Sequence, residues 1–109
     1  MPLEITLTQA GARIVGELDM ATAGQLKEFF SQDAIPPGRF ELDVSGMSFM
    51  DSSGLEVFLR YAASRPEGAP LVLRNATRPV LRVFEIAVPG GVQGLELEPA
   101  GVQDAGMKG

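Results

Sequence analysis

The sequence predicts an α/β fold, in which a mixed, largely parallel sheet begins with one antiparallel hairpin and carries its helices mainly on one face. Segments that alternate in polarity or are continuously apolar, as strands do, are separated by segments of helical periodicity. Parallel strands require such long crossover connections. The chain has 109 residues, 45% hydrophobic and 21% charged, which suffices for one domain with a core. The expected order is β-β-α-β-α-β-α-β.

The first two strands are expected to form the hairpin. Apolar and polar residues alternate from Leu3 to Thr8, which is the period of a half-buried strand. A short turn at residues 9–11 separates this strand from a second one over residues 12–18. Gly16 lies inside the second strand, where a glycine indicates a bulge or a close approach of another backbone.

A first helix is predicted after Asp19, because the apolar residues between positions 23 and 30 fall on one helical face. Asp19 or Thr22 could cap its start, and Thr22 with Gln25 fits a capping box. The Ile-Pro-Pro-Gly sequence at 35–38 ends the helix.

The central segment joins a strand to a helix. Strict alternation over residues 40–45 predicts a half-buried strand, and a turn is expected at Ser45-Gly46. From Leu55 onward apolar residues recur at i, i+3, i+4 and i+7, which predicts a second helix. That helix is expected to end near Ala63-Ser64, because a proline follows at position 66.

A third strand-helix pair follows. Residues 70–74 form a short, mostly apolar run that is typical of an interior strand. Asn75 or Thr77 is expected to cap the next helix, with Pro79 in its first turns. The helix should stop at Pro89-Gly90-Gly91.

The chain is expected to end with an edge strand and a tail. Residues 94–98 alternate in polarity, whereas residues 99–109 are rich in glycine and alanine and have little to bury. We therefore expect one domain over residues 3–98 and a flexible tail over residues 99–109.

Composition argues against several functions. There is no cysteine and no histidine, which removes disulfides, thiol catalysis, and the commonest general base and metal ligand. The net charge of −5 argues against a nucleic-acid-binding surface. No signal peptide or membrane-spanning stretch is visible, so we expect a cytoplasmic protein without membrane insertion.

Enzymatic or metal chemistry is not expected. The sequence contains neither a phosphate-binding glycine loop nor a nucleophile elbow, so we predict no catalytic residue and no cofactor. Asp19, Asp43 and Asp51 could together hold Mg²⁺ in a fold of this kind. We favour the simpler interpretation that Asp19 and Asp51 cap helices and Asp43 is solvated.

Ser52 and Ser53 lie with Asp51 where the second helix begins. Unpaired backbone N–H groups and the helix dipole make this a place that accepts an anion. Either hydroxyl could simply cap the helix. If one serine were phosphorylated, it would gain about −1.5 to −2 charges, and a partner packed against the unmodified serine could no longer dock. Both interpretations stay open from the residues alone.

Residues 43–55, Asp-Val-Ser-Gly-Met-Ser-Phe-Met-Asp-Ser-Ser-Gly-Leu, closely resemble the signature of STAS domains, the family of the bacterial anti-sigma factor antagonists. Two weaker matches lie in register with it, Gly-Glu-Leu-Asp at 16–19 and Leu-Arg-Asn at 73–75. The likeness extends over about residues 3–98.

The resemblance implies a phosphoprotein that regulates transcription by partner switching. Such antagonists bind an anti-sigma factor, commonly a serine kinase with a histidine-kinase-like ATPase fold, and so release a sigma factor. The kinase phosphorylates a serine of the Asp-Ser-Ser-Gly motif, which abolishes binding, and a serine phosphatase restores it. Carried onto this chain, the phosphorylated residue is Ser53, and Asp19, Asp51, Ser52, Ser53 and Gly54 belong to the partner-binding surface.

The resemblance also allows an alternative. Related domains serve constitutively as accessory subunits of phospholipid-transport ABC complexes or as stress-signalling scaffolds, and many of the transport group lack a phosphorylatable serine, so Ser53 favours the antagonist. Nine of the fourteen acidic residues lie at or before Glu56. This acidic half would suit a basic partner surface, although solvated charge explains it equally well. We expect a monomer or a weak dimer.

Overall fold

The computed structural model describes residues 2–32, 35 and 38–100. Its elements follow the predicted order. They are β1 (Glu4–Leu7), β2 (Gly11–Leu18), α1 (Ala23–Phe30), β3 (Phe40–Met50), α2 (Ser52–Ala63), β4 (Leu71–Ala76), α3 (Arg78–Ala87) and β5 (Leu95–Pro99).

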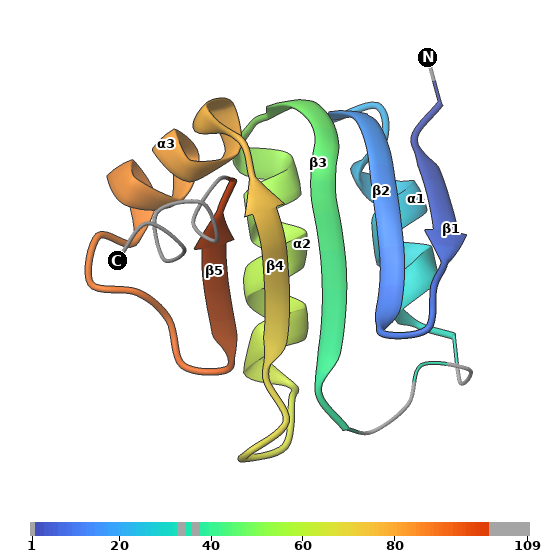
Figure 1. The fold of residues 1–109 in the computed structure, drawn as a ribbon. Coiled ribbons are helices and arrows are strands. Elements are labelled where there is room, and N and C mark those ends of the chain that lie inside the picture. Colours follow the sequence, from blue (N-terminus) through green and yellow to red (C-terminus); the bar gives the residue numbers. More distant parts are fainter. Residues whose placement is uncertain (1, 33–34, 36–37, 101–109) are drawn as a thin grey trace, which may run out of the picture.

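The strands form one sheet in the order β1-β2-β3-β4-β5. β1 pairs with β2 antiparallel, and every later pair is parallel. Figure 1 shows α1 and α2 behind the sheet, with the strands in front of them. The Phe84 ring of α3 lies 6.3 Å from the Phe58 ring of α2, so α3 packs against the same layer. The predicted hairpin, the parallel sheet and the helix-covered face are confirmed.

The core lies between the sheet and the helices. Phe40, Leu42 and Val44 of β3 are each at most 2% exposed, while Glu41 and Asp43 between them are half-buried. This alternation places the apolar side chains under the helices and the carboxylates on the opposite face, which none of the described helices covers and which we call the helix-free face (Figure 1). Burial of the apolar residues against α1 and α2 is the main force that holds the layers together.

β3 runs without interruption to Met50, so the turn predicted at Ser45-Gly46 is wrong. The strand keeps its pairing with β2 through a register shift between Arg13 and Val15, after which Val15 is the partner of Gly46. A Cβ atom on Gly46 would lie 2.8 Å from Cγ2 of Val15. The glycine therefore permits close strand packing and does not form a turn.

Gly16 has the predicted role. Its φ is +123°, and the β2–β3 register shifts between Gly16 and Glu17. A residue with a side chain adopts this conformation only with strain, so the glycine accommodates a bulge shortly before β2 ends.

The capping box predicted for Thr22 and Gln25 is wrong. Thr22 occupies the N-cap position of α1 but makes no cap hydrogen bond with its side chain. Its Oγ1 donates to the carbonyl oxygen of Glu17 over 2.7 Å. Oε1 of Gln25 accepts from the N–H of Leu3 over 3.1 Å. Both side chains therefore join α1 to the preceding strands instead of capping it.

α3 begins at the predicted position, but its first residue is not capped by the predicted side-chain hydrogen bond. Thr77 is the N-cap residue and Pro79 lies in the first turn. Oγ1 of Thr77, however, donates to the carbonyl oxygen of Met47 over 3.0 Å and so makes no cap hydrogen bond. Asn75 has a φ of +59° and makes the bend before the helix.

The remaining limits of the strands agree with prediction to within two residues, whereas α1 ends at Phe30, ahead of the Ile-Pro-Pro-Gly sequence that was expected to stop it. Pro99, expected in the tail, is the last residue of β5, and the N–H of Ala100 donates to the carbonyl oxygen of Ala76 over 3.0 Å. Residues 101–109, the rest of the predicted tail, lie outside the described residues.

Candidate functional site

The carboxyl ends of β2 and β3 bring two of the predicted site segments together. Leu18 and Met50 are partners in the β2–β3 register, and the N–H of Asp51 donates to the carbonyl oxygen of Leu18 over 3.1 Å. Asp19 and Asp51 therefore leave the sheet side by side, and the serines that follow Asp51 lie at the same edge.

Asp51 caps α2. Its backbone is extended, and its Oδ1 accepts from the N–H of Ser53 over 2.8 Å and from the N–H of Gly54 over 3.3 Å. The carboxylate satisfies two of the N–H groups that a helix start leaves unpaired. The interpretation that a serine hydroxyl caps this helix is therefore wrong.

The two serine hydroxyls have no structural task in the described part of the chain, where neither forms a hydrogen bond. Ser52 is exposed and Ser53 is half-buried. Both belong to the first turn of α2, where the positive end of the helix dipole lies. The site thus presents two hydroxyls that are available for chemistry beside a carboxylate that already caps the helix.

Gly54 is buried and has a packing role. A Cβ atom on it would lie 2.4 Å from Cγ of Leu18 and 3.1 Å from Cγ of Met50. No real Cβ atom approaches so closely, so only glycine lets the first turn of α2 pack on the ends of β2 and β3. Gly54 thus keeps residues 51–54, which we call the serine loop, packed on the ends of β2 and β3.

Asp19 holds the turn between β2 and α1. Its Oδ1 accepts from the N–H groups of Ala21 and Thr22 over 2.9 and 3.2 Å. The prediction that Asp19 caps α1 is wrong, because Thr22 is the N-cap residue and the Asp19 carboxylate bonds the turn ahead of it. Because Asp19 and Asp51 lie at one edge, the serine loop is set in an acidic surrounding.

Asp43 lies elsewhere. It is eight residues before Asp51 along an extended strand, a separation of about 25 Å. Its Oδ1 accepts from the N–H of Ser45 over 3.0 Å and from Nδ2 of Asn75 over 3.3 Å. Because Asp43 is half-buried, the carboxylate is solvated only in part. Burial alone would raise the pKa of Asp43, but the hydrogen bonds from Ser45 and Asn75 lower it below its ordinary value.

The magnesium alternative for Asp19, Asp43 and Asp51 finds no support in this arrangement, because Asp43 is far from the other two. Across residues 2–32, 35 and 38–100, no three side chains of His, Cys, Asp or Glu gather as metal ligands would.

An ion-pair network covers part of the helix-free face. Nε of Arg39 and Nη1 of Arg74 lie 3.0 and 3.1 Å from the carboxylate oxygens of Glu41. Arg74 also reaches Glu98 over 3.1 Å. The hydrogen bonds from Arg39 and then Arg74 hold the pKa of Glu41 below its ordinary value. Arg74, which follows the acidic half of the sequence, thus pairs with carboxylates of its own chain.

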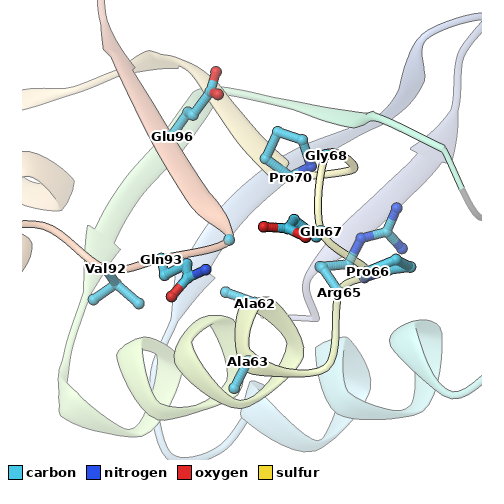
Figure 2. A pocket seen from close by; sticks show the side chains of 11 residues that line it. Ala62, Ala63, Arg65, Pro66, Glu67, Gly68, Pro70, Val92, Gln93 and Glu96 are labelled. Atoms are coloured by element: carbon cyan, nitrogen blue, oxygen red, sulfur yellow. The ribbon is translucent and has the colours of Figure 1, made fainter.

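A cavity of about 660 Å³ lies away from the serine loop (Figure 2). It opens between the C-terminal end of α2 at Ala62 and the segments that lead into β4 and β5, whereas the serines begin α2. None of the predicted site residues lines it. Nε of Arg65, at its wall, donates to the carbonyl oxygen of Ala69 over 2.9 Å.

Sequence reasoning missed two residues at the serine edge. Met20 is 82% exposed in the turn after β2, and Phe49 is 44% exposed near the end of β3. The available signal was an apolar residue beside each predicted acidic site residue, Met20 after Asp19 and Phe49 two positions before Asp51.

The fold is that of a small α/β domain that presents two serine hydroxyls at one edge of its sheet. Residues 3–94 match the sequence model of the family described as Mlab, STAS domain, and the chain belongs to the STAS domain family. The family and fold class predicted from the sequence are thereby confirmed. No helix in the described ranges has both the length and the hydropathy needed to cross a membrane.

Two curated relatives carry the name anti-sigma-B factor antagonist, one from Listeria monocytogenes serovar 1/2a and one from Listeria innocua serovar 6a. Each is 33% identical over 75 residues, which is 67% of this chain and 66% of the relative. The matched segment thus spans just under two thirds of these relatives. Their names describe regulators, in agreement with the prediction that the chain is not an enzyme.

Two solved structures share the fold. The anti-sigma factor antagonist SpoIIAA in its unphosphorylated form is 22% identical, with a TM-score of 0.57 and coverage of 97% of this chain and 96% of that one. A STAS domain protein from Planctomyces limnophilus, described as an anti-sigma-factor antagonist, is 13% identical, with a TM-score of 0.61 and full coverage of both chains.

Proposed function

We propose that this chain is an anti-sigma factor antagonist. In its unphosphorylated state it binds an anti-sigma factor, a serine kinase with a histidine-kinase-like ATPase fold, and so releases a sigma factor in the cytoplasm. Phosphorylation of Ser53 ends the binding, and a serine phosphatase restores it. The names of the Listeria relatives support the antagonist function.

The observation that carries the switch is the cap made by Asp51. Because this carboxylate already satisfies the N–H groups of Ser53 and Gly54, the Ser53 hydroxyl can be modified without loss of a helix cap. The start of α2 also tolerates added negative charge. A phosphoryl group there changes the surface and leaves the fold intact.

The modification is an ordinary phosphoryl transfer. Oγ of Ser53 attacks the γ-phosphorus of ATP bound to the kinase, the bond between that phosphorus and the β,γ-bridging oxygen breaks, and ADP leaves. The hydroxyl proton passes to a base of the kinase. The antagonist supplies only the hydroxyl, so it needs no catalytic residue or cofactor of its own.

The loss of binding follows from charge. The phosphoserine carries about −1.5 to −2 charges, and a partner that packs on Ser52 and Ser53 would have to strip water from this dianion. The carboxylates of Asp51 and Asp19 at the same edge make the local field still more negative. Gly54 takes part by holding the loop in place.

The test uses purified chain, ATP and the anti-sigma factor kinase of the same genome, with the modified residue mapped by mass spectrometry. We expect one phosphate on the wild type, none on Ser53→Ala, and one on the matched control Ser52→Ala. The opposite pattern in the two variants would move the switch to Ser52. An unmodified wild type would contradict the proposal.

A constitutive accessory subunit of a phospholipid-transport ABC complex, or a stress-signalling scaffold, would behave differently. Such a subunit would co-purify with the transporter ATPase, and Ser53→Asp would leave that complex intact. The antagonist is the better-supported function because its switch uses a hydroxyl that forms no hydrogen bond within the described part of the chain.

A further inference from the structure

Two large apolar side chains lie exposed beside the serine loop. Met20 is 82% exposed and Phe49 is 44% exposed. Glu17 is the β2 partner of Phe49, and Leu18 is the partner of Met50. The bond from the N–H of Asp51 to the carbonyl oxygen of Leu18 therefore places the Met20 turn and the end of β3 at the edge where α2 begins.

Phe49 extends this edge onto the face of the sheet opposite the helices, and Met20 lies in the turn between β2 and α1. Met47 and Met50 are 1% and 2% exposed and belong to the core under the helices. Phe49 precedes Met50 in an extended strand, so it points to the opposite side of the sheet. A single exposed apolar side chain is ordinary, but these two lie on segments that the bond from Asp51 to Leu18 joins at the start of α2.

Acidic groups border this surface. Glu17 is exposed, and Asp19 and Asp51 are half-buried. In the described ranges none of these three carboxylates forms an ion pair. Arg78, at the start of α3, is a basic residue at the same end of the sheet. The charge of the border is thus mainly negative and open to a basic partner.

We propose that Met20 and Phe49 are the apolar anchors through which this chain docks on its anti-sigma factor. The partner supplies an apolar pocket bordered by arginine or lysine side chains, which pair with Glu17, Asp19 and Asp51. This inference rests on the proposed function and adds the residues that provide affinity. A phosphoryl group on Ser53 brings a dianion to the margin of the apolar contact, where its desolvation opposes docking.

The test measures the affinity of the full chain for the purified anti-sigma factor kinase by calorimetry. Met20→Ser and Phe49→Ser are each expected to weaken binding about tenfold or more, as the loss of an interface anchor does. Leu7→Ser is the matched control, because Leu7 is 67% exposed and pairs with Ala12 at the opposite end of the sheet. It should stay within about twofold of the wild type.

The possible outcomes distinguish an error in the assignment of Met20 and Phe49 from an error in the proposed antagonist function. If Ser53→Asp loses binding while Met20→Ser and Phe49→Ser bind like the wild type, the anchors are wrong and the switch stands. If the wild type does not bind the kinase, the proposed function fails and the anchors fail with it. Thermal unfolding of each variant checks the fold, and Met20, being almost fully exposed, can be replaced without disturbing the core.

A second copy of this chain is the rival occupant of the surface. Sedimentation of the isolated protein decides this directly. A stable wild-type dimer that Phe49→Ser converts to a monomer would assign the anchors to self-association and overturn the proposal. A wild type and a variant that sediment alike support docking of the anti-sigma factor.

Discussion

The backbone N–H of Asp51 donates a hydrogen bond to the carbonyl oxygen of Leu18 over 3.1 Å. This bond continues the β2–β3 pairing one step beyond Met50 and fixes the start of α2 against the end of β2. As a result, the Asp19 turn and the serine loop present one surface. The switch that we propose depends on this placement, since the modified hydroxyl must lie within the contact it controls.

The cap of α2 can be tested by Asp51→Ala. We expect a loss of about 1 kcal/mol in the free energy of unfolding, the usual effect of removing an N-cap side chain. Urea unfolding measures it. Ser52→Ala is the control and should change the free energy by less than about 0.5 kcal/mol. A neutral Asp51→Ala together with a destabilising Ser52→Ala would mean that the serine caps the helix.

The packing role of Gly54 predicts opposite effects of alanine at two helical glycines. Gly54→Ala should destabilise the protein by about 1–3 kcal/mol, because the new Cβ would overlap Leu18. Gly24→Ala is the matched control in α1, where nothing lies within 4 Å of the added atom. It should stabilise the helix by about 0.5–1 kcal/mol. Equal free energies of unfolding for the two variants would refute the close packing.

Ser53→Asp should weaken partner binding without lowering the free energy of unfolding. A negative charge in the first turn of a helix is favourable by about 0.3–1 kcal/mol, so the free energy of unfolding should stay the same or rise slightly. Denaturant unfolding at low salt would show it. A clear loss of stability would indicate that the anion disturbs α2, and the phosphate would then act by unfolding and not by changing the surface.

Local signals predicted much of the fold. Alternation predicted the buried side of β3, and the helical period predicted α2 to within one residue of its end. The turn expected at Ser45-Gly46 was wrong because pairing with β2, distant in sequence, keeps the segment extended. Pairing with a neighbouring strand here outweighs the local preference of Ser45 and Gly46 for a turn.

Side-chain partners far apart in sequence could not be predicted. The side chain of Gln25 accepts a hydrogen bond from the N–H of Leu3, and the hydroxyl of Thr22 donates one to the carbonyl oxygen of Glu17. Neither side chain therefore completes the capping box that their spacing suggested. The sequence places the serines and Asp51 at the helix start, but only the three-dimensional structure assigns the cap to the carboxylate. The exposed apolar side chains at the site emerged only when the end of β3 was placed beside the Asp19 turn.

The ion pairs of Glu41 predict a pH dependence of stability. Its pKa lies lower in the folded protein than the ordinary value of 4.5, because Arg39 and Arg74 donate to its carboxylate. A carboxyl of this kind stabilises the fold above its unfolded pKa, and the contribution is lost as the pH falls through the folded pKa. The free energy of unfolding should therefore decrease on acidification below about pH 4.5.

Glu41→Gln should have a weaker dependence on pH in this acidic range than the wild type. Glu85→Gln, which removes an exposed carboxylate that forms no ion pair in the described ranges, is the control and should keep the wild-type slope. Urea unfolding at a series of pH values measures both. Identical slopes for Glu41→Gln and the wild type would show that the Arg39 and Arg74 contacts contribute nothing.

The proposed switch depends on the single hydroxyl of Ser53, and its most direct measurement is the affinity of the anti-sigma factor for two forms of one protein. Unmodified chain and chain phosphorylated on Ser53 are titrated separately into the purified kinase without ATP. We expect the phosphorylated form to bind about a hundredfold more weakly, a difference of about 2.7 kcal/mol, while Ser53→Ala binds like the unmodified protein even after incubation with kinase and ATP. Equal affinities of the two forms would contradict the switch.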